Sequence, residues 1–150
     1  MDEKYKWDAG DYRRNSLNQQ KWARELIGKF SVSGRERILD IGCGDGKVTF
    51  ELSRLVPEGS VVGIDNSEDM ITLAQRTYPP DEFPNLKFQV KDARELGFKE
   101  EFHIIFSNAA LHWIVHHKPV LRGMSKSLKP SGRVLLQMGG RGNASGLIDI

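Results

Sequence analysis

The residues best suited to chemistry are three closely spaced glycines that follow a short apolar run. They stand in the segment Leu39-Asp40-Ile41-Gly42-Cys43-Gly44-Asp45-Gly46. Glycine lets the backbone turn sharply and approach a ligand closely, and the free N–H groups of a helix start attract negative charge. A dinucleotide fingerprint requires Gly-x-Gly-x-x-Gly, whereas here the third glycine comes one residue early and Lys47 takes its place. The pattern favours a nucleotide-type ligand over a pyrophosphate, although a tight strand-to-helix turn also explains it.

Two acids follow later apolar runs. Asp65 ends the run after the glycines, at roughly the 20-residue distance at which doubly wound folds place an acid for ribose hydroxyls. Its alternative role is to cap the next helix, but the Ser67 hydroxyl suits that role equally well. Asp92 follows a further apolar run, and Ala93 beside it is small enough to let an adenine ring pass. The sequence therefore predicts a polar rim, with a simple loop acid as the alternative for Asp92.

The histidines and the cysteine support weaker hypotheses. His112 could receive a proton or orient a substrate, or it could simply pack with Trp113 over the crevice at the ends of the predicted strands. His116 and His117 have no second cluster of ligands nearby in sequence, so we predict a solvated helix start and no metal site. Cys43 lies inside the glycine segment, where a small buried residue needs no redox role.

The elements that must position these residues alternate between strands and helices. Apolar periodicity predicts strands at Arg37–Ile41, Ser60–Asp65, Leu86–Val90, Phe102–Phe106 and Arg133–Met138. It predicts helices at Asp11–Phe30, Lys47–Leu55, Glu68–Tyr78 and Lys118–Leu128, with a turn at Lys129–Gly132. Strands that alternate with helices form a parallel sheet with right-handed crossovers, and apolar strands indicate a sheet covered on both faces. The predicted fold class is α/β, a doubly wound, Rossmann-like, mostly parallel sheet of about five strands.

Composition limits the class of protein. The 150 residues suit one domain, 1–150, in which 1–10 form a partly ordered lead-in and 139–150 a loop or truncated tail. With 22 Lys and Arg against 20 Asp and Glu, no basic stripe indicates a nucleic-acid partner. One cysteine forms no internal disulfide, and no apolar run reaches the ~18 residues of a membrane span. The N-terminus shows no secretory signal, so a cytoplasmic location is expected.

The chain resembles the class I S-adenosylmethionine-dependent methyltransferases over about residues 11–140. Five segments occur in the order found in that family: Asp40-Ile41-Gly42-Cys43-Gly44-Asp45-Gly46, Gly63-Ile64-Asp65-Asn66-Ser67-Glu68-Asp69-Met70, Lys91-Asp92-Ala93, Phe106-Ser107-Asn108-Ala109-Ala110-Leu111-His112-Trp113 and Leu128-Lys129-Pro130-Ser131-Gly132-Arg133-Val134. The Asn-Ala-Ala-Leu-His-Trp stretch is most similar to the trans-aconitate methyltransferases and the malonyl-carrier-protein methyltransferases.

The resemblance implies S-adenosylmethionine as cofactor, with S-adenosylhomocysteine as product, and a set of residues around it. In chain order these are Asp40, Gly42, Cys43, Gly44, Asp65, Asn66, Met70, Asp92, Ala93, Asn108 and Ala109, with Tyr12 and Gln20 as candidates to cover the site. The glycines would approach the methionine half, and Asp40 would orient its ammonium through backbone or water. Asp65 would bind the ribose, with Asn66 beside the ribose or the adenine. Met70, Asp92 and Ala93 would surround the adenine, and Asn108 and Ala109 would lie next to the sulfonium.

The resemblance also implies a small-molecule methyl acceptor, a carboxylate or an acyl thioester acid. A carboxylate is already ionised at pH 7 and needs no general base. For a hydroxyl or amine acceptor a base would help, and His112 is then the candidate catalytic residue. Two alternatives stay open: a nicotinamide-dependent oxidoreductase, which Lys47 disfavours, and a non-catalytic cofactor-binding fragment.

Members of the resembled family continue past the fifth strand with a helix and a final antiparallel pair that completes seven strands. This chain ends after the fifth predicted strand, which indicates a truncated core lacking the C-terminal strands. The fifth strand would then present an open edge, through which self-association is expected. A chain extended beyond Ile150 should be more soluble and more active.

Overall fold

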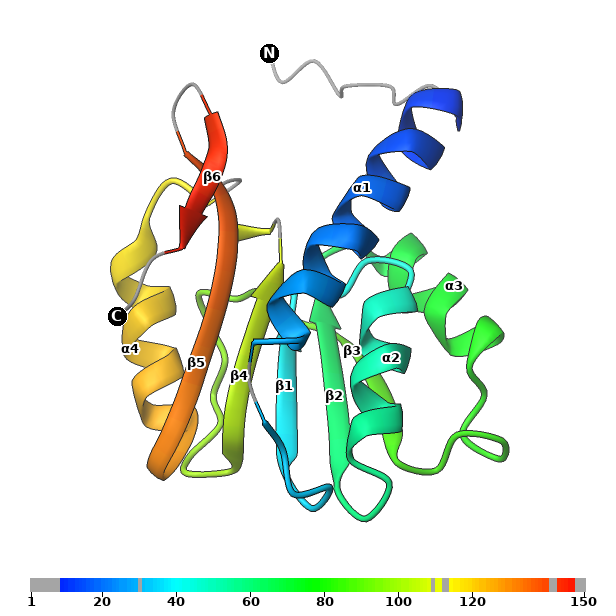
Figure 1. Cartoon of the computed structure of the whole chain (residues 1–150). Coiled ribbons are helices and arrows are strands. Elements are labelled where there is room, and N and C mark those ends of the chain that lie inside the picture. Colours follow the sequence, from blue (N-terminus) through cyan, green and yellow to red (C-terminus); the bar gives the residue numbers. More distant parts are fainter. Residues whose placement is uncertain (1–8, 30, 109, 112–113, 141–142, 148–150) are drawn as a thin grey trace.

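A six-stranded sheet forms the centre of the computed structural model, which describes residues 9–29, 31–108, 110–111, 114–140 and 143–147 (Figure 1). The strands are β1 (Arg37–Ile41), β2 (Ser60–Asp65), β3 (Leu86–Val90), β4 (Phe102–Asn108), β5 (Leu128–Gly140) and β6 (Asn143–Leu147). Their spatial order is β3-β2-β1-β4-β5-β6. The first five pair in parallel, and β6 pairs antiparallel with β5.

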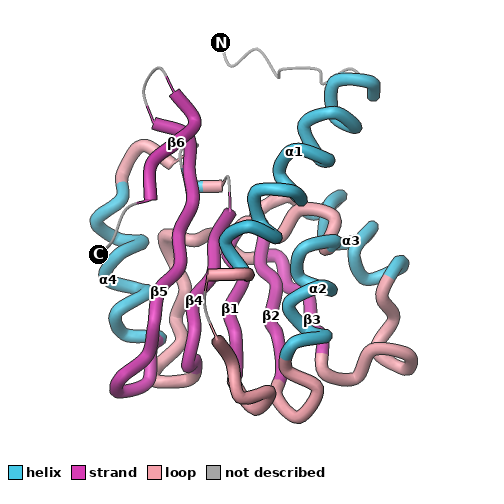
Figure 2. The backbone as a smooth tube through the Cα atoms, in the orientation of Figure 1, coloured by secondary structure: helices cyan, strands magenta, loops and turns pink. Residues whose placement is uncertain are grey.

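Helices cover both faces of the sheet (Figure 2). They are α1 (Ala9–Ile27), α2 (Lys47–Leu55), α3 (Glu68–Thr77) and α4 (His117–Ser127). Apolar residues of α1, α2 and α3 share one buried cluster with one face of the strands, and residues of α4 share a second cluster with the other face. The predicted doubly wound, Rossmann-like α/β fold with five parallel strands is confirmed.

The chain reverses its direction of progress across the sheet between β1 and β4, which are neighbours in space but not in sequence. In open α/β sheets, ligands bind outside the carboxyl ends of the strands at such a switch point. The glycine segment follows β1, and Asp65 and Asn108 end β2 and β4, so all three lie along that edge. The topology therefore brings together the residues that the sequence singled out.

Three details differ from the sequence-based expectation. The predicted turn at 129–132 lies within β5, where the register jumps from the Phe102–Leu128 pair to the Ile104–Arg133 pair. The intervening residues form a bulge in which Ser131 has φ +64°, so a turn-forming composition becomes an interruption inside a long strand. The tail expected as a loop contains β6, which pairs with Gln137, Met138 and Gly140. The open edge predicted for the fifth strand is therefore covered there, and the expectation of a free edge at that position is wrong.

The N-terminal boundary also shifts slightly, because α1 already begins at Ala9, inside the predicted lead-in. Among the helices of the described part of the chain, none combines the length and the apolar character that a membrane crossing requires.

Candidate cofactor site at the carboxyl edge of the sheet

The glycine segment forms a tight loop bonded to the neighbouring strand. The backbone N–H groups of Gly42 and Cys43 both donate to the carbonyl of Ile64, at 2.8 and 2.9 Å. Gly46 donates to the carbonyl of Cys43 at 3.0 Å, which closes the turn just before α2 begins. The loop is thus anchored to β2 and not merely to its own strand.

Steric contacts explain two of the glycines. Gly42 has φ +77°, and a Cβ there would overlap the Cβ of Ala110, in the loop after β4. Gly46 has φ +86°, and a Cβ would come within 2.7 Å of the Phe88 ring on β3. Both positions therefore exclude side chains through backbone conformation and through packing together. Gly44 differs, because nothing lies within 4 Å of the position its Cβ would take. That open face is where a ligand can approach the backbone.

Asp65 joins the glycine loop to the start of α3. One carboxylate oxygen, Oδ2, accepts from the N–H of Gly44 at 3.0 Å, and Oδ1 accepts from the N–H of Ser67 at 2.9 Å. The Ser67 hydroxyl in turn accepts from the Met70 N–H at 3.3 Å, which confirms the predicted helix cap. The Asp65 side chain is only half-buried, and each carboxylate oxygen retains lone-pair capacity for a further donor.

Asp40 is enclosed beneath α2. Its side chain is 2% exposed and sits beneath α2, where the Thr49 hydroxyl donates to Oδ2 at 2.8 Å. Burial raises the pKa of this carboxyl to about 7; the Thr49 hydrogen bond lowers it, and the negative charge of Asp65 raises it further. With its carboxylate enclosed, Asp40 can face a ligand through its backbone.

The predicted adenine-side residues lie at the ends of β2 and β3. Asn66 is exposed and Met70 is half-buried on α3. Asp92 forms an ion pair with Arg94, with a shortest distance of 2.6 Å. Hydrogen bonds from the Arg94 side chain and backbone hold the pKa of Asp92 below its usual value. Ala93 packs against the apolar cluster on the α4 face.

Asn108 ends β4 beneath α1. Its Nδ2 donates to the backbone carbonyl of Gln19 at 2.9 Å, while its Oδ1 is buried without a hydrogen-bond partner among the described residues. The proposed cover residue Gln20 instead donates to Glu51 on α2 at 2.9 Å, beside the Arg24–Glu51 ion pair. Side-chain hydrogen bonds therefore connect the helix α1 to both α2 and the sheet edge.

For several of the predicted site residues, the side chain or the whole residue lies outside the described part of the structure. Tyr12 belongs to α1, but its side chain is outside the described part. Ala109, His112 and Trp113 lie outside the described residues. Cys43 is buried, and this burial, together with the nearby carboxylates of Asp40 and Asp65, raises the pKa of its thiol strongly. Such a thiol is not poised for nucleophilic chemistry.

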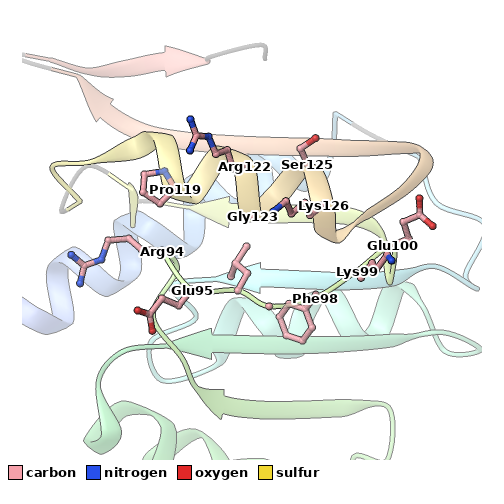
Figure 3. Close-up of a pocket in the computed structure, with 12 residues that line it drawn as sticks. Arg94, Glu95, Phe98, Lys99, Glu100, Pro119, Arg122, Gly123, Ser125 and Lys126 are labelled. Carbon is pink, nitrogen blue, oxygen red and sulfur yellow. The ribbon is translucent and has the colours of Figure 1, made fainter.

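A separate groove lies between α4 and the segment that leads from β3 to β4 (Figure 3). Its volume is about 700 Å³. Arg94 at one end is already paired with Asp92, and the walls mix both charges, with Glu95 and Lys99 on one side and Arg122 on α4. The groove belongs to the α4 face of the sheet. The side chains of Asp40 and Asn108 instead bond to Thr49 on α2 and to Gln19 on α1. The glycine edge is the candidate cofactor site, because the loop hydrogen bonds and Asp65 converge there.

Comparison with known proteins identifies the fold. A family model described as "Methyltransferase domain" matches residues 33–141. The chain belongs to this methyltransferase family. An uncharacterized methyltransferase of Schizosaccharomyces pombe is 38% identical over 152 residues, covering 99% of this chain and 56% of its own length. The crystal structure of a Haemonchus contortus phosphoethanolamine N-methyltransferase in complex with S-adenosyl-L-methionine has a TM-score of 0.71 and 27% identity, covering 85% of this chain and 30% of that one.

The two groups named by the family resemblance are also among the relatives of this methyltransferase domain. A trans-aconitate 2-methyltransferase of Methylobacterium nodulans is 30% identical, covering 88% of this chain and 49% of its own length. A malonyl-[acyl-carrier protein] O-methyltransferase of Bacillus cereus is 31% identical, covering 90% and 51%. The family prediction is therefore confirmed, and the chain spans about half the length of the curated relatives it matches.

Sequence reasoning missed two polar residues whose side chains carry buried oxygens. Thr49 is fully buried and holds Asp40; it recurs with Leu52, Ser53 and Val56 at helical spacing, so its inward position could have been read from the sequence. Gln137 interrupts the apolar run of β5 and carries a buried oxygen that has no hydrogen-bond partner among the described residues. A polar residue within a strand covered on both faces is the signal that could have identified it.

Proposed function

We propose that this chain binds S-adenosylmethionine at the carboxyl edge of its sheet and takes part in transfer of its methyl group to a small-molecule acid. The observation that carries the proposal is the Asp65 carboxylate, bonded to Gly44 beside the open face of the glycine loop. Membership of the methyltransferase family and the similarity to an enzyme crystallised with S-adenosyl-L-methionine support the same cofactor. No relative among these supports the oxidoreductase alternative.

The residues present fit such a cofactor in chemical terms. The half-exposed Asp65 has lone pairs for ribose hydroxyls, and Gly44 leaves room for close backbone approach. Asn66 and Met70 follow Asp65 toward α3, where an adenine would lie between them and the Asp92–Ala93 turn. Asn108 ends β4 on the other side of the switch point, where we place the methionine half and the reacting sulfonium. Ala109 follows it in the sequence and lies outside the described residues.

When bound, S-adenosylmethionine supplies an activated methyl group on a sulfonium. The protein's part is to align the acceptor with that group and to exclude water. We propose a carboxylate or acyl thioester acid as the acceptor class, because two of the relatives carry names of that kind. An acid already ionised at neutral pH needs no proton removed, so His112 becomes a general base only for a hydroxyl or amine acceptor.

Calorimetric titration with S-adenosylmethionine, S-adenosylhomocysteine and NAD tests the cofactor. We expect saturable binding of the two sulfur ligands and none of NAD. The Asp65→Ala variant removes a charged acceptor of ribose hydrogen bonds, each worth about 1.5–3 kcal/mol, and should weaken binding by about 100-fold or more. Asp81→Ala, an exposed position after α3, makes the same charge change and should leave affinity within about twofold.

Unchanged affinity in Asp65→Ala, or tight binding of NAD alone, would refute the assignment. Circular dichroism on each variant separates loss of the site from loss of the fold.

A further inference from the structure

Two amide side chains at the carboxyl edge have buried oxygens that no described residue satisfies: Asn108 Oδ1 and Gln137 Oε1. Their Cα atoms are register partners on β4 and β5, so the two residues stand side by side in the sheet. Partners in a parallel register point to the same face. A single place in the fold therefore holds two unsatisfied acceptors.

The orientation of the Asn108 amide is fixed by its surroundings. Its nitrogen donates to the carbonyl of Gln19 on α1, and a carbonyl oxygen accepts only from the N–H end of an amide. Rotating the amide would place two oxygens against each other. The oxygen is thus the end that is left without a partner, and what it lacks is specifically a hydrogen-bond donor.

The pair lies on the far side of the cofactor edge from Asp65. The β1–β4 register pairs Asp40 with Phe106, so Asn108, two residues later, is level with Gly42. Gln137 is one strand further out, on β5. Strands are spaced about 4.8 Å apart, so roughly 14 Å separate β2, which ends in Asp65, from β5. A ligand reaching Gln137 extends past the proposed ribose and sulfonium positions.

Leaving a buried carbonyl oxygen without a donor is costly, so such a group in a native structure requires an explanation, and a functional role or a bound water is one. We infer that the side chains of Asn108 and Gln137 form a subsite for the methyl acceptor. Their two oxygens accept hydrogen bonds from a neutral donor on that molecule, either a hydroxyl or an amide N–H. This rests on the proposed function. Two amide oxygens carry partial negative charge, so they repel a carboxylate. Asn108 lies beside the proposed sulfonium position and Gln137 one strand beyond it, so the subsite holds a second group of the methyl acceptor on the β5 side and leaves the acid group to the methyl of the sulfonium.

The first test concerns the free protein and needs no acceptor. Gln137→Met removes the unsatisfied oxygen at nearly constant volume and should raise the melting temperature. The control is Gln75→Met, which removes an amide that donates to the Phe88 carbonyl at 3.1 Å and should lower it. A lower melting temperature for Gln137→Met would show that the oxygen has a partner already, and would overturn the inference.

The second test uses probes that differ in the donor alone, titrated into protein saturated with S-adenosylhomocysteine. Malate against succinate tests a hydroxyl source, and malonyl N-acetylcysteamine thioester against malonyl 2-acetoxyethyl thioester, in which an ester oxygen replaces the amide N–H, tests an amide source. We expect one donor-bearing probe to bind about three- to tenfold more tightly than its partner. Gln137→Met should reduce that advantage to within about twofold and leave S-adenosylhomocysteine affinity unchanged.

Equal affinities within both pairs, or no probe binding, would overturn the subsite. Failure of S-adenosylhomocysteine itself to bind would instead refute the proposed function, so the two failures are distinguishable.

Discussion

The buried carboxyl of Asp40 should make the stability of this protein fall as the pH rises. Burial brings its pKa from 3.8 to about 7. Between those values the folded protein keeps a proton that the unfolded chain has released, so each increase in pH favours unfolding. The slope is about 1.4 kcal/mol per pH unit, and the full loss is about 4 kcal/mol above pH 7. This is a large share of the 5–15 kcal/mol typical of a domain.

Asp40→Asn removes the titrating group and keeps an oxygen for the Thr49 hydroxyl, which donates at 2.8 Å. The free energy of unfolding of the variant should lack this pH dependence. We therefore expect the difference between Asp40→Asn and wild type to grow by about 4 kcal/mol in favour of the variant from pH 4 to pH 8. Taking the difference cancels the titration of groups that are not coupled to Asp40, such as Glu36, whose pKa lies at about 2.

Urea unfolding of both proteins at each pH unit between 4 and 8 measures this quantity. Asp81→Asn is the matched control, because it makes the same chemical change at an exposed position. If Asp40→Asn and wild type lost stability in parallel, the Asp40 carboxyl would not be protonated at neutral pH. The account of its burial beneath α2 would then be wrong.

Two further predictions concern the glycine loop. Gly42→Ala should cost more stability than Gly97→Ala in urea unfolding, because both have positive φ but only Gly42 would overlap Ala110. We expect about 1–2 kcal/mol for the backbone term at Gly97 and more at Gly42; equal losses would argue against that contact. The Cys43 thiol, whose pKa is raised by burial and by the carboxylates of Asp40 and Asp65, should react with a disulfide reagent about 100-fold more slowly in the folded protein than in urea. Similar rates would mean that the glycine loop opens readily.

Much of the fold was predictable because the strands here are short, apolar and separated by clear helix signals. Ser60–Asp65, Leu86–Val90 and the helix cap at Ser67 are found where the sequence predicts them. The bulge near Ser131 was not, because Pro-Ser-Gly composition indicates a turn locally and cannot show that the strand resumes in register beyond it. Pairing with β4 decides that, and pairing is a property of the whole sheet.

The site was predictable in its residue types but not in its contacts. The distance from the glycines to Asp65 indicates a shared edge, yet nothing in that spacing reveals that the Asp65 carboxylate bonds to Gly44 itself. Similarly, Asp40 stands in the motif, and only the position of Thr49 on α2 shows that its carboxylate is enclosed beneath that helix. Spacing along the chain locates an edge, whereas side-chain partners depend on the packing of α1 and α2 over it.

The polar groups along this edge are of two kinds, and we expect one kind to bind the cofactor and the other to select the methyl acceptor. On β1 and β2, the loop N–H groups and the Asp65 carboxylate are bonded to one another, so that part is already organised before a ligand arrives. On β4 and β5, no residue in the described part of the chain donates to the buried oxygens of Asn108 and Gln137. An organised subsite binds without reordering, whereas unsatisfied acceptors discriminate between ligands with and without a donor. If that division holds, changes at Asp65 should alter cofactor affinity for every acceptor, while changes at Gln137 should alter which acceptor is preferred.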